Sequence, residues 1–252
     1  MARLGQCSPC SCWGLFSAEP RRQRTGMSSS SALIFLHGSG DTGEGVQAWL
    51  HAVSGGAFEA SLAREGISML FPTATMIPYS LIGGMPRTVW FDRVAMAYEA
   101  PEDVAGLKRS VELVDKEIDK LVESGIPLSK IGVGGMSMGG CVALHVAYGM
   151  GRHAGRLGMV ASLSTFLPKE SYFDADASRR LTASQTAPLF MAHGQDDGMI
   201  RIEWARATHS RLLAAGIDCK ELLEFPGVQH ELCTEEVGLL RSFVLQHLGK
   251  GS

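Results

Sequence analysis

The sequence predicts a single α/β domain in which a mainly parallel sheet is covered by helices on both faces. From Ser31 onward, short apolar runs typical of buried strands alternate with longer segments of helical periodicity. The chain has 252 residues and 45% of them are hydrophobic, so it can bury one sizeable core. We therefore expect one domain over residues 31–250.

The predicted elements follow one another in a regular order. Buried strands are expected at residues 32–36, 67–71, 131–134, 158–163, 188–192 and 221–225. The clearest helix opens at Pro101-Glu102-Asp103 and repeats apolar residues at helical spacing until Gly125. Further helices are expected at residues 46–53, 138–148, 203–214 and 235–248.

The first thirty residues differ from the rest and are expected to form a disordered extension. They contain Cys7, Cys10 and Cys12, four arginines and one acid. Organellar transit peptides have a similar composition, and clustered cysteines near a chain end can be acylated, which would give a weak membrane association. The Cys-x-x-Cys-x-Cys spacing could also hold a metal, but a fourth ligand is missing nearby.

The overall composition argues against several classes of partner. The formal net charge is −3 and the basic residues are scattered, so we expect no nucleic-acid partner. No apolar run approaches the roughly 20 residues that span a bilayer. The six cysteines lack the dense spacing of small secreted domains and are interpreted as reduced thiols. These features predict a cytoplasmic protein.

The strongest local signal is the segment Gly135-Met136-Ser137-Met138-Gly139. It joins a predicted strand to a predicted helix, which is the context of the nucleophile elbow in the α/β-hydrolase fold. In that strained turn, side chains at the flanking positions would collide with the neighbouring strand and helix, so glycines are needed. A helix N-terminus also directs backbone N–H groups toward the serine oxygen. We predict that Ser137 is a catalytic nucleophile.

A serine nucleophile needs a base that removes its proton and an acid that orients the base. In the α/β-hydrolase fold the acid and then the base follow the nucleophile, each on a loop after a strand. Asp197 and His230 occupy these two positions. By position alone, Asp196 could serve in place of Asp197.

The other seven histidines are expected to be structural. Five of them fall within or beside predicted helices. His37 and His193 each end a strand before a glycine, and we expect them to shape turns.

Hydrolysis of an acyl group also needs N–H donors for the oxygen of the tetrahedral intermediate. We expect these to be the backbone N–H groups of Ser39, on the loop after the first strand, and of Met138. The segment 38–43 also matches the Gly-x-Gly-x-x-Gly fingerprint of dinucleotide sites, but the next strand does not end in the acid that would hold the ribose. No cofactor and no metal is expected.

The motifs together resemble the acyl-protein thioesterase and lysophospholipase family of serine hydrolases. The matching segments are residues 33–43, 71–74, 89–92, 134–141, 193–197 and 230–231, and the resemblance covers residues 32 to about 248. It implies a cofactor-free esterase or thioesterase that acts on acylated small molecules, lysolipids or S-acylated proteins. It also selects Asp197, because the acid of that family lies four residues after the histidine of a His-Gly-x-x-Asp segment.

The segment 76–85 is too apolar and flexible for an ordinary surface loop, so we expect it to form a wall of the acyl pocket. The residues expected to bind substrate are Met76, Ile77, Tyr79, Leu81, Trp90, Phe166, Leu167 and Met199. Any of them could instead pack beneath loops. Two other functions are considered: a non-catalytic ligand-binding protein of the same fold, and a peptidase of the same fold.

Overall fold

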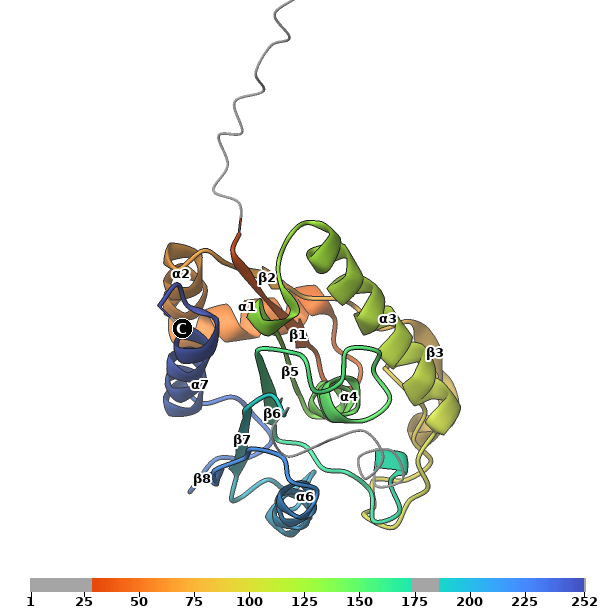
Figure 1. Ribbon diagram of the computed structural model, residues 1–252. Coiled ribbons are helices and arrows are strands. Elements are labelled where there is room, and N and C mark those ends of the chain that lie inside the picture. Colours follow the sequence, from red (N-terminus) through yellow and green to blue (C-terminus); the bar gives the residue numbers. More distant parts are fainter. Residues whose placement is uncertain (1–28, 174–185, 252) are drawn as a thin grey trace, which may run out of the picture.

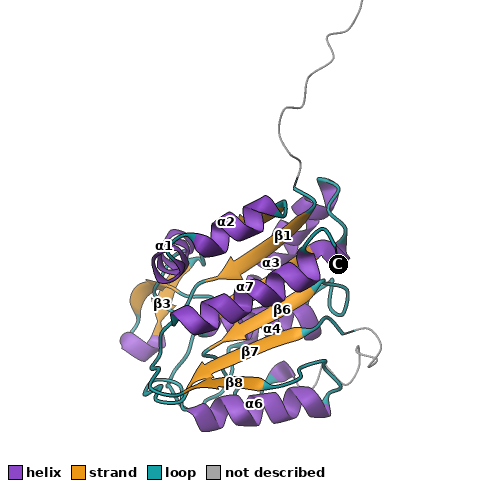
Figure 2. Ribbon diagram, turned by 90° about the vertical axis from the view of Figure 1, so that its left-hand side faces the viewer, coloured by secondary structure: helices purple, strands orange, loops and turns teal. Residues whose placement is uncertain are grey.

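The computed structural model describes residues 29–173 and 186–251 (Figure 1). Within them, six parallel strands form one sheet in the order β2-β1-β5-β6-β7-β8, and helices cover both of its faces (Figure 2). The predicted fold class is therefore confirmed. The predicted N-terminal extension, with Cys7, Cys10 and Cys12, lies outside the described residues except for Ser29 and Ser30.

The strands of this sheet agree with the predicted ones to within two residues at each end. They are β1 (Ser31–Leu36), β2 (Ile67–Leu70), β5 (Ile131–Met136), β6 (Met159–Leu163), β7 (Leu189–Gly194) and β8 (Leu222–Phe225). The inner strands β1, β5, β6 and β7 are buried along their whole length. Burial on both faces explains why these segments are continuously apolar rather than alternating.

The helices form two layers, one on each side of the sheet (Figure 2). One layer contains α1 (Gly43–Ser54), α2 (Ala57–Arg64) and α7 (Thr234–Leu248), and the other contains α3 (Val104–Glu123), α4 (Met138–Tyr148) and α6 (Ile202–Ala214). Helix α4 is buried at every position because it lies between the sheet and α3. None of the helices in the described ranges is long and apolar enough to cross a membrane.

The hydrophobic core is divided by the sheet into two clusters. Ile34 and Leu36 of β1 point into the cluster beneath α3, α4 and α6. Leu33 and Phe35 point into the cluster beneath α1, α2 and α7. This alternation along one strand is what places the carboxyl end of β1 firmly between two packed layers.

Helix α2 was not predicted from the sequence. Its eight residues lie between the glycine pair at 55–56 and Gly66, so the segment resembles a loop. The helix forms because Phe58 and Leu62, one turn apart, are both fully buried in the cluster that α7 also joins.

Residues 76–85, which are expected to form a wall of the acyl pocket, fold into a hairpin that was not predicted from the sequence. β3 (Met76–Tyr79) and β4 (Met85–Thr88) form an antiparallel hairpin outside the main sheet, with a short 3-10 turn at Ser80–Ile82. Pro78 faces Pro86 across the hairpin, and proline within an apolar run argues against a strand. The hairpin end is held by the Asp92 carboxylate, which accepts hydrogen bonds from the N–H (2.8 Å) and hydroxyl (2.5 Å) of Ser80.

Candidate active site

Ser137 occupies the sharp turn between β5 and α4. Its φ of 55° and ψ of −121° lie outside the regions that a non-glycine residue normally adopts. The turn is held by the Ser137 N–H, which donates to the Leu163 carbonyl at 2.8 Å, and by the Thr165 hydroxyl, which donates to the Ser137 carbonyl at 2.6 Å. Strain of this kind persists only where the surroundings impose it, and it is common at functional sites.

Gly139, two residues after Ser137, allows the backbone of α4 to approach the end of β1. A Cβ atom at Gly139 would lie 2.4 Å from the Leu36 carbonyl oxygen and 2.6 Å from that of His37. The elbow glycine is therefore required by contact with the end of β1, a strand more than a hundred residues earlier in the chain.

Replacing Gly139 by Ala is expected to reduce the free energy of unfolding by about 2–3 kcal/mol, because two backbone carbonyls must move away. Urea unfolding of the purified variant measures this loss. The control is Gly238→Ala in α7, where a Cβ meets nothing within 4 Å and the higher helix propensity of Ala should stabilise by up to about 1 kcal/mol. Equal stability of the two variants would contradict the crowding argument.

The loop that follows β1 lies directly against the Ser137 turn. A Cβ at Gly38 would be 3.4 Å from Ser137 Cβ and 4.0 Å from Ser137 Oγ. The hydroxyl of Ser39 lies 3.7 Å from Met138 Sδ, so the two residues predicted as oxyanion donors are neighbours. Met138 is the first residue of α4, where backbone N–H groups have no partner within the helix.

Hydrogen bonds made by Trp90 and His37 hold the loop after β1 in place. The Trp90 indole N–H donates to the His37 carbonyl at 2.9 Å, and the two rings lie 5.0 Å apart. The His37 Nε2 accepts from the Ala74 N–H at 3.0 Å, and its Nδ1 lies 2.7 Å from the Gly38 carbonyl. Burial lowers the pKa of His37, and only a neutral imidazole can accept through Nε2 while it donates through Nδ1. His37 therefore shapes the turn, as predicted.

His230 and Asp197 are in contact at the same edge of the sheet. His230 Nδ1 lies 2.7 Å from Asp197 Oδ2, on the loops that follow β8 and β7. The Asp197 side chain is fully buried, whereas the His230 side chain is 17% exposed. The imidazole can therefore reach a substrate while the carboxylate stays behind it.

The Asp197 carboxylate is held by several donors. Its Oδ1 accepts from the N–H groups of Met199 and Ile200, both at 2.8 Å, and His193 Nε2 lies 3.3 Å from Oδ2. Burial opposes ionisation, but the hydrogen bonds from His193, His230 and Ile200 outweigh it and hold the pKa of Asp197 well below its usual range. Asp197 is thus a permanent anion beside His230.

Asp196 is the alternative to Asp197 by position, and His193 is expected only to shape a turn. Asp196 is exposed, and its only hydrogen bond to another described residue is from its backbone N–H to the Val228 carbonyl, at 3.0 Å. His193 does more than shape a turn, since it also approaches Asp197. Its spacing of four residues before Asp197 is the signal that could have revealed this contact.

Ser137 Oγ and His230 are not joined by a hydrogen bond in the described structure. Both residues lie at the carboxyl edge of the sheet, Ser137 after β5 and His230 after β8. The catalytic roles assigned to Ser137, Asp197 and His230 therefore stay predictions.

The helix after His230 begins with a capping box in which cysteine replaces serine or threonine. The Cys233 Sγ accepts from the Glu236 N–H at 3.4 Å, and the Cys233 N–H donates to the Glu236 carboxyl group. Glu236 is 1% exposed, and its Oε2 has no partner in the described part of the chain. Burial raises the pKa of Glu236 to about 8, so the carboxyl group is protonated at neutral pH.

This raised pKa predicts a loss of stability with increasing pH. The folded state binds the Glu236 proton more tightly than the unfolded chain, so the stabilisation is complete below about pH 4.5 and is lost as the pH rises through about 8. Glu236→Gln should flatten the decline in unfolding free energy between pH 5 and about 9, as measured by urea titration. Glu235→Gln, on the exposed side of the same turn, should leave the decline unchanged. Parallel pH profiles for all three proteins would refute the assignment.

The residues predicted to bind substrate divide into two groups. Met76 and Met199 are 63% and 51% exposed, and Ile77 and Leu81 are half-buried. Tyr79, Trp90, Phe166 and Leu167 are buried, and Phe166 packs between Trp204 and the Arg93 guanidinium. Contact of these four buried residues with an acyl chain stays a prediction. In the free chain their side chains pack against other residues of the protein.

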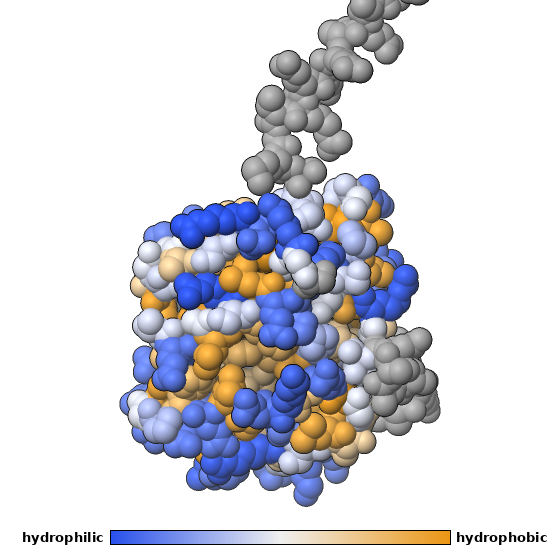
Figure 3. Space-filling model, turned by 60° about the vertical axis from the view of Figure 1, so that its left-hand side comes forward, coloured by the Kyte–Doolittle hydropathy of each residue, from blue (hydrophilic) through white to orange (hydrophobic). Residues whose placement is uncertain are grey.

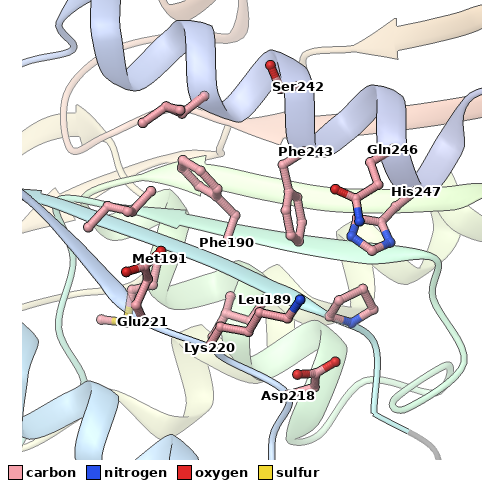
Figure 4. Close-up of a pocket in the computed structure, with 13 residues that line it drawn as sticks. Leu189, Phe190, Met191, Asp218, Lys220, Glu221, Ser242, Phe243, Gln246 and His247 are labelled. Atoms are coloured by element: carbon pink, nitrogen blue, oxygen red, sulfur yellow. The ribbon is translucent and has the colours of Figure 1, made fainter.

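Two depressions in the described structure are candidates for the substrate site. One, of about 350 Å³, adjoins the loop after β1 and is lined by Ser39, Gly40, Tyr79, Ile82 and Arg87. The other, of about 330 Å³, lies between α7 and the amino ends of β7 and β8, where Phe190 faces Phe243 (Figure 4). Apolar surface is visible among polar side chains on the face shown in Figure 3. None of the residues that line the second depression is a predicted site residue, whereas the first contains two.

One group of side chains has the composition of a metal site. Ligand atoms of Glu102, before α3, and of Cys141 and His145, both on α4, lie within 4.8 Å of one another. The Glu102 oxygens, however, already accept from the Ser171 hydroxyl and the Tyr172 N–H, at 2.8–3.0 Å. Burial raises the pKa of the Cys141 thiol far above its usual value, which disfavours the thiolate that a metal requires. We interpret the group as a buried hydrogen-bond network that fastens α4 to the loop before α3.

Comparison with known proteins agrees with this geometry. Residues 22–248 match the phospholipase/carboxylesterase family. The chain belongs to this family. The resemblance seen in the sequence is thus confirmed, and the family consists of ester hydrolases of the α/β-hydrolase fold.

Two curated relatives extend the comparison. Lysophospholipase-like protein 1 of Mus musculus is 35% identical over 221 residues, which is 87% of each chain. Acyl-protein thioesterase 1 homolog 2 of Dictyostelium discoideum is 29% identical over 222 residues, or 88% of this chain and 94% of the relative.

Two solved structures are similar to this chain over the same region. SOBER1 of Arabidopsis thaliana gives a TM-score of 0.74 at 25% identity, over 86% of this chain and 99% of that one. Acyl-protein thioesterase 2 of Zea mays gives 0.67 at 26% identity, over 88% and 95%. The likeness therefore covers nearly the whole described chain.

Proposed function

We propose that the protein hydrolyses carboxylic esters or thioesters through Ser137, His230 and Asp197. The observation that carries the proposal is the 2.7 Å contact between His230 Nδ1 and the buried Asp197 carboxylate, at the sheet edge that also carries the strained Ser137 turn. A histidine oriented in this way has Nε2 free to accept the serine proton. The names of the relatives point to lysolipids or S-acylated proteins as substrates.

The proposed reaction proceeds in two steps. Ser137 Oγ attacks the acyl carbon while His230 Nε2 takes its proton, and the resulting oxyanion accepts hydrogen bonds from the N–H groups of Ser39 and Met138. The tetrahedral intermediate collapses, and the protonated imidazole gives its proton to the leaving alcohol or thiol. A water molecule then attacks the acyl-serine ester, His230 takes the water proton, and its return to Oγ releases the acid. The Ser137–His230 hydrogen bond needed for the first step can form on substrate binding, since catalytic hydrogen bonds are often long in free enzymes.

The test uses the purified full chain with a fluorophosphonate probe and three substrates. The expected result is a covalent adduct that peptide mass spectrometry places on Ser137, together with turnover of a p-nitrophenyl ester and an acyl thioester. Labelling without turnover of any substrate would favour a non-catalytic binding protein. Cleavage of the matching peptide amide at a comparable rate would favour a peptidase. Labelling at another serine would refute the assignment of Ser137.

We also infer that the protein acts in the cytoplasm as one catalytic domain over residues 31–250. Cys141, Cys219 and Cys233 are free thiols in the described part of the chain, which suits a reducing compartment. Expression of the tagged full chain followed by fractionation tests the location, and recovery in a secreted or organellar fraction would contradict it.

A further inference from the structure

The depression beside the loop after β1 has a polar end that the proposed hydrolysis does not use. Ser39 and Gly40 form one side, and Tyr79, Ile82 and Arg87 of the hairpin form the other. The oxyanion donor proposed above is the N–H of Ser39, so a bound ester would extend into this depression directly from its carbonyl group.

The hairpin is fastened to the loop, which fixes the distance between them. The Gly40 N–H donates to the Thr88 carbonyl at 2.9 Å, and the Thr88 hydroxyl donates to the Asp41 carbonyl at 2.5 Å. A Cβ at Gly40 would lie 3.8 Å from Arg87 Cδ, so the Arg87 side chain passes along the loop. Thr88, the residue after Arg87, therefore fastens this end of the hairpin to the loop through two hydrogen bonds, which holds Arg87 beside the loop.

The positive charge of Arg87 is not neutralised within the described residues. It forms no ion pair there, and its side chain is exposed. Of the two nearby acids, Asp92 binds Ser80 and the Arg93 N–H. The Asp41 carboxylate lies against Gly45 at the start of α1. An exposed guanidinium without a carboxylate partner is a ready binding group for planar anionic oxygens.

Tyr79, a second residue that lines the depression, has a hydroxyl group without a hydrogen-bond partner in the described part of the chain. The residue is 4% exposed. A buried hydroxyl without a partner is unfavourable, and most such groups in folded proteins are satisfied. Tyr79 lines the same depression as Arg87. Its hydroxyl is closed to solvent in the free chain, so donation to an anionic oxygen held by Arg87 requires the Tyr79 side chain to turn toward the depression.

We propose that the active site prefers esters bearing an anionic oxygen group, a carboxylate or a phosphate, close to the scissile carbonyl, with Arg87 and Tyr79 binding that group. The inference rests on the proposed ester hydrolysis and specifies its substrate class. The anion can belong to the acyl half, as in the half-ester of a dicarboxylic acid, or to the leaving group, as in an acylglycerol phosphate. Ile82 supplies an apolar contact for the methylenes in between.

The test compares matched anionic and neutral esters. The acyl arm uses the mono-p-nitrophenyl ester of adipic acid against p-nitrophenyl hexanoate, and the leaving-group arm uses monohexanoylglycerol phosphate against monohexanoylglycerol. The quantity compared is the ratio of kcat/KM for the anionic ester to kcat/KM for the neutral ester. In at least one arm, Arg87→Gln should lower this ratio about tenfold, because the KM for the anionic ester rises. Tyr79→Phe should lower the same ratio in the same direction.

Arg156→Gln is the matched control, because Arg156 is exposed on the loop before β6 at the opposite end of the sheet. It makes the same change in net charge and should leave the ratio unaltered. The arm in which the ratio falls identifies the half of the substrate that carries the anion. A ratio that changes less than twofold in both arms for Arg87→Gln overturns the proposal, even if ester hydrolysis itself is confirmed.

Equilibrium binding separates this inference from the proposed function. Isothermal titration of the Ser137→Ala chain with adipate monoester and with monohexanoylglycerol phosphate needs no turnover. If Arg87→Gln, added to the Ser137→Ala chain, weakens the binding of either ligand about tenfold, the anion site is supported. This conclusion holds whether or not the wild-type chain hydrolyses esters. Binding that is insensitive to Arg87→Gln for both ligands refutes it.

Discussion

Ser137→Ala should reduce kcat for a p-nitrophenyl ester by about 10⁵-fold, to near the uncatalysed rate, because no covalent acyl-enzyme can form without the hydroxyl. The variant should fold, since only one oxygen is lost from a side chain that makes no hydrogen bond to His230. The N–H and carbonyl bonds to Leu163 and Thr165 that hold the turn are untouched. Thermal unfolding of the purified variant checks this point.

The control for this experiment is Ser242→Ala on the exposed side of α7. It should retain both turnover and fluorophosphonate labelling. If Ser137→Ala kept more than a tenth of the wild-type rate with a normal unfolding profile, a different nucleophile or a water-based mechanism would have to replace the proposed one.

Asp197→Asn is expected to have the second-largest effect, a fall in kcat of about 10³–10⁴-fold. That magnitude comes from the corresponding change in chymotrypsin-like proteases. The Asp197 oxygens accept from two backbone N–H groups and lie against two imidazoles. An amide must turn its NH₂ group toward either the backbone donors or His230. In the second orientation His230 Nδ1 becomes an acceptor, so Nε2 carries the proton and can no longer act as a base.

Asp196→Asn is the matched control for this change. The two positions are adjacent, but the Asp196 side chain is exposed and forms no hydrogen bond in the described structure. Its kcat should stay within about twofold of the wild type, as for most surface substitutions. Equal losses for the two variants would show that the charge of the loop matters, rather than the orientation of His230.

Much of the fold follows from local pattern. The buried strands are short apolar runs, and α3 shows helical periodicity from its cap at Asp103, whose carboxylate accepts from the Gly106 N–H. Helix α2 and the β3–β4 hairpin could not be found in this way. Both are short, both contain or adjoin glycine or proline, and both are stabilised by contacts with residues distant in the chain.

The candidate site was predictable where chain order and turn chemistry specify it. Ser137 and His230 could be assigned because each follows a recognisable strand. Position alone left Asp196 and Asp197 open, and the family resemblance selected Asp197. The positions of Trp90 beneath the loop and of Arg87 beside it were not predictable, since they depend on how the hairpin docks. Likewise, only packing decides that Phe166 is buried while Met199 is exposed.

The amino-acid sequence by itself therefore determined the strands, the longer helices and the elbow glycines, because these depend on period, burial and backbone conformation within a few residues. The tertiary structure alone decided that the Asp197 carboxylate is buried against His230, how His193 joins them, and which side chains line the depression. Those outcomes depend on contacts between loops that are far apart in the chain. They also depend on which side chains become buried, which is decided only when the helices and strands pack together.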